Sequence, residues 1–221
     1  MKTAVVTDGK YRASLAAVRA LGEAGFSVVV TQTRQEAVHT PASFVSKFTK
    51  EGRWMEGSCR DADYGERLTA LLQAYDRPVL FPTGADTLRW ISAHREELAG
   101  TADFLVASPQ ALADLNDKET VHQRCLALGL PVPQEYDGPP DRYPVVVKPR
   151  CGEQFGLKSW ERYTIAEGQA AYQRAYETMS QYGGAPIVQE KVSGPGEGVN
   201  LLLDQNCRLV CAFCHRRLRE C

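Results

Sequence analysis

The chain has 221 residues, enough for one large domain or two small ones with a hydrophobic core. Hydrophobic residues make up 43% of it and charged residues 24%, and 26 basic against 27 acidic side chains leave a net charge of -1, which gives no basis for binding DNA, RNA or a membrane surface. No apolar run approaches the length of a membrane span, and charged residues come too early for a signal peptide. We therefore expect a cytoplasmic protein whose seven cysteines are reduced.

The first part of the chain predicts a strand, a helix and a strand. A short apolar strand at 3–7 ends in Asp8-Gly9, a helical pattern follows as far as Gly25, and 26–31 is the next strand. This order favours a parallel sheet with helices on its faces. The Asp8-Gly9 turn lacks the three glycines of a dinucleotide-binding fingerprint, so we expect no NAD site there.

The same alternation continues towards residue 108. Helices at 64–75 and 87–98 flank a strand at 78–81, and 104–107 is predicted as the last strand of this half. Ser108-Pro109 then supplies a capping residue and a proline at the first helical position, so we place a domain boundary there.

The second half predicts a mixture of helices and strands. We expect a helix, a strand, a loop, a returning strand and a second helix at 116–128, 143–148, 151–156, 159–164 and 166–181. Three apolar strands follow, at 187–190, 199–203 and 209–213.

A stretch at 186–199 is the most informative part of the sequence. An apolar strand enters a short polar hinge and a Gly/Pro turn, and Glu197 then opens a second strand. A strand, hinge and strand can align backbone donors and acceptors along an adenine edge and place a carboxylate near a ribose. Lys118, in the first turn of a helix, and Lys148, at the end of a strand, could supply positive charge for a polyphosphate. Together these residues suggest an ATP site.

The order and spacing of these motifs resemble the ATP-grasp superfamily, especially its carboxylate–amine ligases and carbamoyl phosphate synthetase-like members. The segments that carry the resemblance are 8–30, 81–88, Asn116-Asp-Lys118, 128–133, 143–149, Gln189-Glu-Lys-Val192 and 215–220. The resemblance implies an α/β protein in which a pre-ATP-grasp parallel α/β domain precedes a partial α+β ATP-grasp module. It places the first domain at 1–108, the N-terminal grasp subdomain at 109–185 and the truncated start of the C-terminal subdomain at 186–221.

The resemblance also implies roles for individual residues. These are Lys118 and Lys148 for the α- and β-phosphates, Gly152 and Gly156 for a loop that closes over the phosphates, Glu190, Lys191 and Val192 for the adenine, Glu197 for the ribose, and Arg216 or Arg217 for the γ-phosphate or an acyl phosphate.

The implied activity is a Mg-ATP-dependent ligase. A small-molecule carboxylate attacks the γ-phosphate, and a small-molecule amine then displaces phosphate from the mixed anhydride, with catalysis resting on positioning and charge neutralisation. The family's magnesium ligands lie beyond the basic strand, so we expect them outside this chain. The phosphate loop at 150–157 is also poorer in glycine than the usual pattern and carries Glu153 and Phe155. The alternative is a non-catalytic nucleotide-binding or scaffold protein of the same fold.

A cysteine-rich segment near the C-terminus offers a third reading. It contains Cys207, Cys211, Cys214, His215 and Cys221, and Cys211-Ala-Phe-Cys214-His215 matches the pattern of haem c attachment and could also suggest zinc. We favour the simpler prediction of a strand with small buried cysteines, because covalent haem requires export and zinc usually needs a second pair of ligands.

The three C-terminal strands would form only part of a sheet. Such a sheet leaves apolar faces and an edge open. We therefore expect the chain to be marginally stable or to associate, either as a homo-oligomer or with a partner chain that completes the fold.

Overall fold

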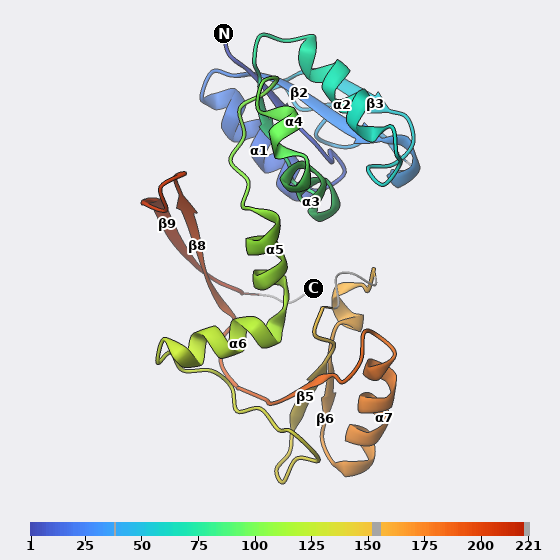
Figure 1. Cartoon of the computed structure of the whole chain (residues 1–221), viewed down its shortest axis with the longest axis vertical. Helices are drawn as coiled ribbons and strands as arrows, with labels where there is room; N and C mark the ends of the chain where they lie inside the picture. The colour runs from blue at the N-terminus through green and yellow to red at the C-terminus, as the bar shows by residue number, and fades with distance from the viewer. Residues whose placement is uncertain (38, 152–155, 219–221) are drawn as a thin grey trace. The chain divides into compact units, whose positions relative to one another are not determined.

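The protein is described by a computed structural model that covers residues 1–37, 39–151 and 156–218 (Figure 1). The chain divides into two compact units, Met1–Pro109 and Gln110–Cys221, which we call unit 1 and unit 2. Within the described ranges, no helix has both the length and the apolar character needed to span a lipid bilayer.

Unit 1 contains the predicted parallel sheet. Its strands are β1 (Thr3–Val6), β2 (Ser27–Thr33), β3 (Thr49–Met55) and β4 (Val79–Phe81), in the order β3-β2-β1-β4 and all parallel. The valines of β1 and β2 are fully buried, as expected of central parallel strands with both faces covered. The predicted α/β class is therefore confirmed for this unit.

The helices of unit 1 each bury part of their surface. They are α1 (Arg12–Glu23), α2 (Tyr64–Gln73), α3 (Ala85–Ala93) and α4 (Arg95–Leu98), with a short 3-10 helix, η1 (Arg34–Glu36). In α1, Val18 packs against the buried valines of β1 and β2. The chain leaves α1 through Gly25, whose φ of +86° favours glycine, so the predicted end of this helix is correct.

One strand of unit 1 was missed in the sequence analysis, and another was predicted wrongly. β3 was not expected, because its sequence TKEGRWM shows no apolar alternation and buries only Met55; it is an edge strand with charged side chains. The strand predicted at 104–107 does not form. Asp103 makes a single parallel bridge to Val79 and accepts a hydrogen bond from the backbone N–H of Leu80 at 2.8 Å, and the pairing then stops.

The helices that follow the boundary start where the capping residues predict. α5 (Pro109–Asn116) begins at its proline, and α6 (Lys118–Ala127) begins after Asp117. The Asp117 carboxylate accepts hydrogen bonds from the backbone N–H groups of Glu119 (2.9 Å) and Thr120 (3.3 Å), which otherwise lack a partner in the first helical turn.

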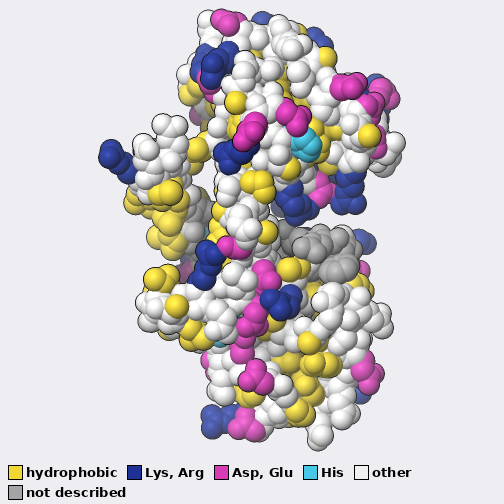
Figure 2. All heavy atoms as spheres, viewed as in Figure 1, with side chains coloured by type: hydrophobic (Ala, Val, Ile, Leu, Met, Phe, Trp, Pro, Cys, Tyr) yellow, Lys and Arg dark blue, Asp and Glu magenta, His cyan; other side chains and the backbone are white. Residues whose placement is uncertain are grey.

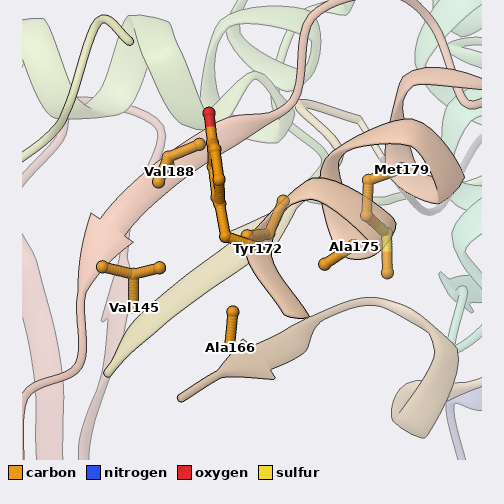
Figure 3. Packing of buried hydrophobic residues seen from close by; sticks show 7 residues of the cluster. Val145, Ala166, Tyr172, Ala175, Met179 and Val188 are labelled. Atoms are coloured by element: carbon orange, nitrogen blue, oxygen red, sulfur yellow. The ribbon is translucent and has the colours of Figure 1, made fainter. Parts of the chain in front are cut away.

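Unit 2 is built around a three-stranded antiparallel sheet with one helix on it. The strands are β5 (Val145–Lys148), β6 (Thr164–Ala166) and β7 (Ile187–Glu190), in the order β6-β5-β7, and the helix is α7 (Gln169–Ser180). Figure 3 shows Tyr172, Ala175 and Met179 of α7 over the inward-facing residues of the strands. The returning strand predicted at 159–164 is wrong, because a 3-10 helix, η3 (Ser159–Glu161), occupies this segment and β6 starts only at Thr164.

The last described elements form a two-stranded hairpin. β8 (Glu197–Leu203) pairs antiparallel with β9 (Leu209–Arg216), and every residue of β9 is exposed. Figure 2 shows hydrophobic side chains gathered on its surface. The prediction of buried cysteines is therefore wrong: Cys207, in the turn of the hairpin, and Cys211 and Cys214, on β9, are exposed. Cys221 falls outside the described residues.

Candidate functional site

Lys148 ends β5 on the face of the sheet that does not contact α7. Val145 and Val147 pack against α7, so the alternation of a strand turns Lys148 to the other face. Its Nζ donates a hydrogen bond to Oε1 of Gln189 at 2.5 Å. Burial and the nearby charge of Lys118 lower the pKa of Lys148, and Glu135 opposes them only in part. The protonated form of Lys148 is thus less favoured than in water, and a nearby anion would stabilise it.

Lys118 reaches the same end of β5 from α6. Its Nζ donates to the backbone carbonyls of Pro149 (3.1 Å) and Arg150 (2.9 Å), the two residues that directly follow the strand. The structure therefore brings together the two lysines to which the sequence assigned the phosphates. Both of these carbonyls are neutral acceptors, so they leave the positive charge of the ammonium in place.

A chain of buried polar side chains lies behind Lys148. Nε2 of Gln189 donates to Oε1 of Glu135 at 2.6 Å, and Nδ1 of His122 lies 3.1 Å from the same oxygen. Gln189 is 7% and His122 8% exposed. Because the amide group of Gln189 bonds a carboxylate through its nitrogen and an ammonium through its oxygen, its orientation is fixed, and it separates Lys148 from Glu135.

Sequence reasoning missed this chain of contacts. Gln189 belonged to the predicted hinge, but Glu135 and His122 carry no motif, and His122 showed no partner at a helpful spacing. The contact arises because Glu135 forms an isolated antiparallel bridge with Gln189, which adds a short edge to β7.

The predicted adenine hinge is only partly available to a ligand. The backbone N–H of Glu190 donates to the carbonyl of Gln134 at 2.9 Å, and its carboxylate accepts from the backbone N–H of Gln134 at 3.0 Å. The backbone N–H of Lys191 donates to Pro144 at 3.3 Å. The N–H groups of Glu190 and Lys191 are therefore in use in this structure, although all three side chains of the hinge, including that of Val192, are exposed.

The residues predicted for the ribose and the γ-phosphate pair with each other on the hairpin. Glu197 lies opposite Arg216 in the register, and its Oε1 is 2.6 Å from Nη2 of Arg216. The backbone N–H of Arg217 donates to the carbonyl of Gly196 at 2.7 Å, which closes the base of the hairpin. A ligand that used Glu197 would have to compete with Arg216.

The predicted phosphate loop is described only at its far end. Gly156 is exposed with φ of +67°, a conformation that favours glycine. Gly152 lies outside the described residues.

The exposed cysteines do not form a chelating pair. Cys211 lies opposite Leu202 and Cys214 opposite Val199, and residues three apart in a strand point to opposite faces. Cys211 and Cys214 therefore do not suit one zinc ion or one haem. Nor does any group of three or more His, Cys, Asp or Glu side chains in the described part of the chain have the placement to hold a metal ion.

Unit 1 has a polar cluster at the carboxyl end of β1, between the connections to β2 and β4. In open α/β sheets this position commonly binds ligands. Here the Asp8 carboxylate accepts from the backbone N–H of Gly84 (3.0 Å) and from Oγ1 of Thr87 (2.8 Å), at the start of α3. A Cβ at Gly84 would lie 2.5 Å from the Asp8 carboxyl carbon, so the close approach requires glycine. The chain's own carboxylate thus occupies the helix N-terminus that could otherwise bind an anion.

Comparison with known proteins gives matches among solved structures. No protein-family model and no curated protein matches the sequence. A complex of Campylobacter jejuni biotin carboxylase with β-γ-ATP matches with a TM-score of 0.64 and 14% identity, over 95% of this chain and 50% of that one. Rhizobium etli pyruvate carboxylase matches with a TM-score of 0.63 and 14% identity, over 95% and 20%.

A third structure is the biotin carboxylase domain of Hydrogenobacter thermophilus 2-oxoglutarate carboxylase, in complex with MgADP, ADP and bicarbonate. It matches with a TM-score of 0.58 and 15% identity, over 90% of this chain and 46% of that one. The chain thus spans about half the length of these carboxylase structures, or less. At this level of identity the likeness is one of fold. It confirms the predicted resemblance at that level: the chain has the fold of the N-terminal domain and the first part of the ATP-grasp module of biotin carboxylases.

Proposed function

We propose that the chain binds the phosphates of ATP or ADP at Lys118 and Lys148. The observation that carries this proposal is the convergence of two ammonium groups at the end of β5. Lys148 bonds a neutral amide, and burial, followed by the charge of Lys118, lowers its pKa. A polyphosphate placed between the two lysines would relieve their repulsion and reverse that shift.

The choice of nucleotide and metal in this proposal rests on the ligands of the structural relatives. The Campylobacter jejuni structure is a complex with β-γ-ATP, and the Hydrogenobacter thermophilus structure contains MgADP. We therefore propose Mg-ATP as the cofactor of this chain, with the magnesium ligands outside it.

The proposed reaction is the ligation of a small carboxylate to an amine. The carboxylate attacks the γ-phosphorus of ATP and releases ADP, which leaves an acyl phosphate. The amine nitrogen then attacks the acyl carbon, the carbon–oxygen bond breaks and phosphate leaves with the electron pair. Arg216 or Arg217 would stabilise the negative charge on the transferred phosphoryl group.

A second candidate is a non-catalytic nucleotide-binding protein of the same fold. The pairing of Glu197 with Arg216 and the use of the Glu190 N–H by Gln134 favour it, because both withdraw predicted ligand groups from the site. In this case the chain would bind ADP and ATP alike without forming an acyl phosphate.

Calorimetric titration of ATP and ADP, with and without magnesium, tests the binding proposal. We expect saturable binding that Lys148→Ala weakens by about 10- to 100-fold, since a hydrogen bond to a charged group contributes about 1.5–3 kcal/mol. Lys50→Ala, at an exposed lysine of β3 in unit 1, should leave it unchanged. Equal affinity of Lys148→Ala and the parent, or no binding to the parent, would overturn the proposal.

Trapping with hydroxylamine separates the two candidates. An acyl phosphate reacts with hydroxylamine to give a hydroxamate, so its appearance with ATP and a panel of carboxylates supports the ligase. Nucleotide binding without any hydroxamate supports the non-catalytic protein.

A further inference from the structure

Unit 2 contains a pocket of about 420 Å³ that involves neither lysine of the proposed nucleotide site. Its walls come from the start of α6, the segment 135–139, α7 and the segment 185–188, with the side chain of Arg150 at one side. This volume lies in the range of pockets that take small organic ligands.

Three tyrosines form the aromatic part of the wall. They are Tyr136, Tyr172 and Tyr176. The rings of Tyr172 and Tyr176 are 5.7 Å apart between centroids and tilted by 59°. Tyr136 is held beside β7 by a hydrogen bond from its backbone N–H to the carbonyl of Val188 at 3.0 Å. The wall is therefore fixed by the packed sheet and helix.

The hydroxyl group of Tyr172 has no partner within the described ranges. The residue is only 7% exposed, and its ring packs in the core with Val188. Figure 3 shows the hydroxyl at the far end of the ring from Val145 and Ala166. Burial, with smaller effects of Tyr176 and Tyr143, raises the pKa of Tyr172, so the phenol stays neutral and can accept a hydrogen bond. A hydroxyl group without a protein partner, on a residue of the pocket wall, can accept a hydrogen bond from a ligand in the pocket.

The charged residues of the wall are mostly acidic. Glu119, Glu135 and Asp137 face one cationic residue, Arg150. The guanidinium of Arg150 is already paired, with Nη2 2.7 Å from Oδ2 of Asp117. The remaining field is negative, and tyrosine faces also attract cations. An anion is therefore disfavoured here, in contrast to the lysine pair.

We propose that this pocket binds an organic ammonium ion. The apolar body of the ligand lies against Tyr136 and Tyr176, and its ammonium group donates to the Tyr172 hydroxyl and faces the carboxylates of Glu119 and Asp137. The proposal goes beyond the nucleotide site and does not depend on it.

A titration with three matched probes tests this. Benzylammonium, benzyl alcohol and benzoate share one ring and differ in charge. Followed by 1H–15N NMR at neutral pH, benzylammonium should give saturable shifts centred on Tyr136, Asp137 and Tyr172, with a Kd of about 1 mM, a value typical of a ligand of this size. The alcohol and the carboxylate should bind at least about fivefold more weakly, which corresponds to the loss of one charge-assisted contact.

Variants of the wall complete the test. Tyr172→Phe keeps the ring and should weaken the binding of benzylammonium by about two- to tenfold, which corresponds to the loss of one hydrogen bond. Asp137→Asn should weaken it by about two- to fivefold, and Asp141→Asn, at an exposed residue outside the pocket, should have no effect. None of the three should alter ADP binding. Equal binding of all three probes, absence of saturable shifts at the wall, or unchanged affinity in Tyr172→Phe would overturn the proposal.

Discussion

Unit 2 contains two antiparallel elements, and the hairpin has the longer strands but very different surroundings. In the sheet β6-β5-β7, α7 covers one face, and Val145, Val147 and Ala166 are fully buried. In the hairpin β8–β9, side chains of the same type, such as Leu201 and Phe213, are exposed. Both have regular pairing. Strand pairing alone therefore does not bury side chains; a packed second layer does. A two-stranded hairpin without such a layer is only marginally stable.

The candidate nucleotide site has residues on both the covered sheet and the exposed hairpin. The phosphate half, Lys148 with Gln189, lies on the packed sheet and is held by partly buried hydrogen bonds. The ribose half, Glu197, lies on the exposed hairpin and is paired with Arg216. We expect the first half to be preorganised for a ligand and the second to rearrange on binding.

The largest expected effect concerns the core of the sheet. Met179→Ala, at a residue of α7 that is 3% exposed, should lower the free energy of unfolding by about 2–5 kcal/mol, because it removes buried apolar volume. Leu201→Ala, at a hairpin residue that is 58% exposed, should change it by less than about 0.5 kcal/mol. Hydrogen exchange of the β5 and β7 amides measures both, and similar losses would show that the hairpin is also packed.

A negative charge introduced next to Lys148 should weaken nucleotide binding. Gln189→Glu places a carboxylate where a neutral amide now accepts from Lys148, so we expect about tenfold weaker ADP binding, equivalent to about 1.4 kcal/mol. Binding should recover as the pH falls and the new carboxyl group is protonated. Calorimetry at several pH values measures this, with Gln73→Glu, an exposed site in unit 1, as the control. Unchanged affinity at neutral pH would place the phosphates elsewhere.

The cap of α6 should matter less than the core. Asp117→Ala should lower the free energy of unfolding by about 1 kcal/mol, because two N–H groups lose their acceptor, and Asp117→Asn should retain most of the cap. Urea denaturation of the three proteins checks this. A loss as large as that of Met179→Ala would contradict it.

The pH dependence of the free energy of unfolding, compared between the parent and Asp117→Asn, tests the ion pair of Asp117 with Arg150. Burial acts to raise the pKa of Asp117, but the hydrogen bonds from Arg150 and the helix amides outweigh it and hold the pKa below 3.8. A lowered pKa in the folded state stabilises it above the unfolded value, and this stabilisation is lost as the pH falls through the folded pKa. The difference between parent and Asp117→Asn should therefore be full above about pH 4 and shrink at lower pH.

The smallest expected effect is on the hairpin. Glu197→Gln removes an ion pair whose side chains are 56% and 65% exposed, so the free energy of unfolding should fall by less than about 0.5 kcal/mol and the effect should vanish at high salt. Thermal unfolding at two salt concentrations measures this. A decrease of more than about 1 kcal/mol in the free energy of unfolding would mean that the hairpin is more ordered than its exposed side chains indicate.

Strong local signals in the sequence predicted most of the elements. Buried valine runs marked β1 and β2, Gly25 ended α1, and Pro109 and Asp117 started α5 and α6. Weak local signals failed: β3 has a charged, unalternating sequence, and 104–107 has strand-like residues but the pairing with β4 stops at Asp103. In both cases the position of the segment at the edge of the sheet decided whether a strand forms, and the sequence does not show which segments lie at an edge.

The sequence by itself determined the parallel α/β start, the lysine that ends β5 and the lysine that begins α6, because each depends on residues close together in the chain. Only the tertiary structure decided that Gln189 stands between Glu135 and Lys148, that Glu197 pairs with Arg216, and that Tyr172 turns its hydroxyl away from the core. These contacts join segments far apart in sequence, and their geometry follows from strand register and helix packing, which no local pattern encodes.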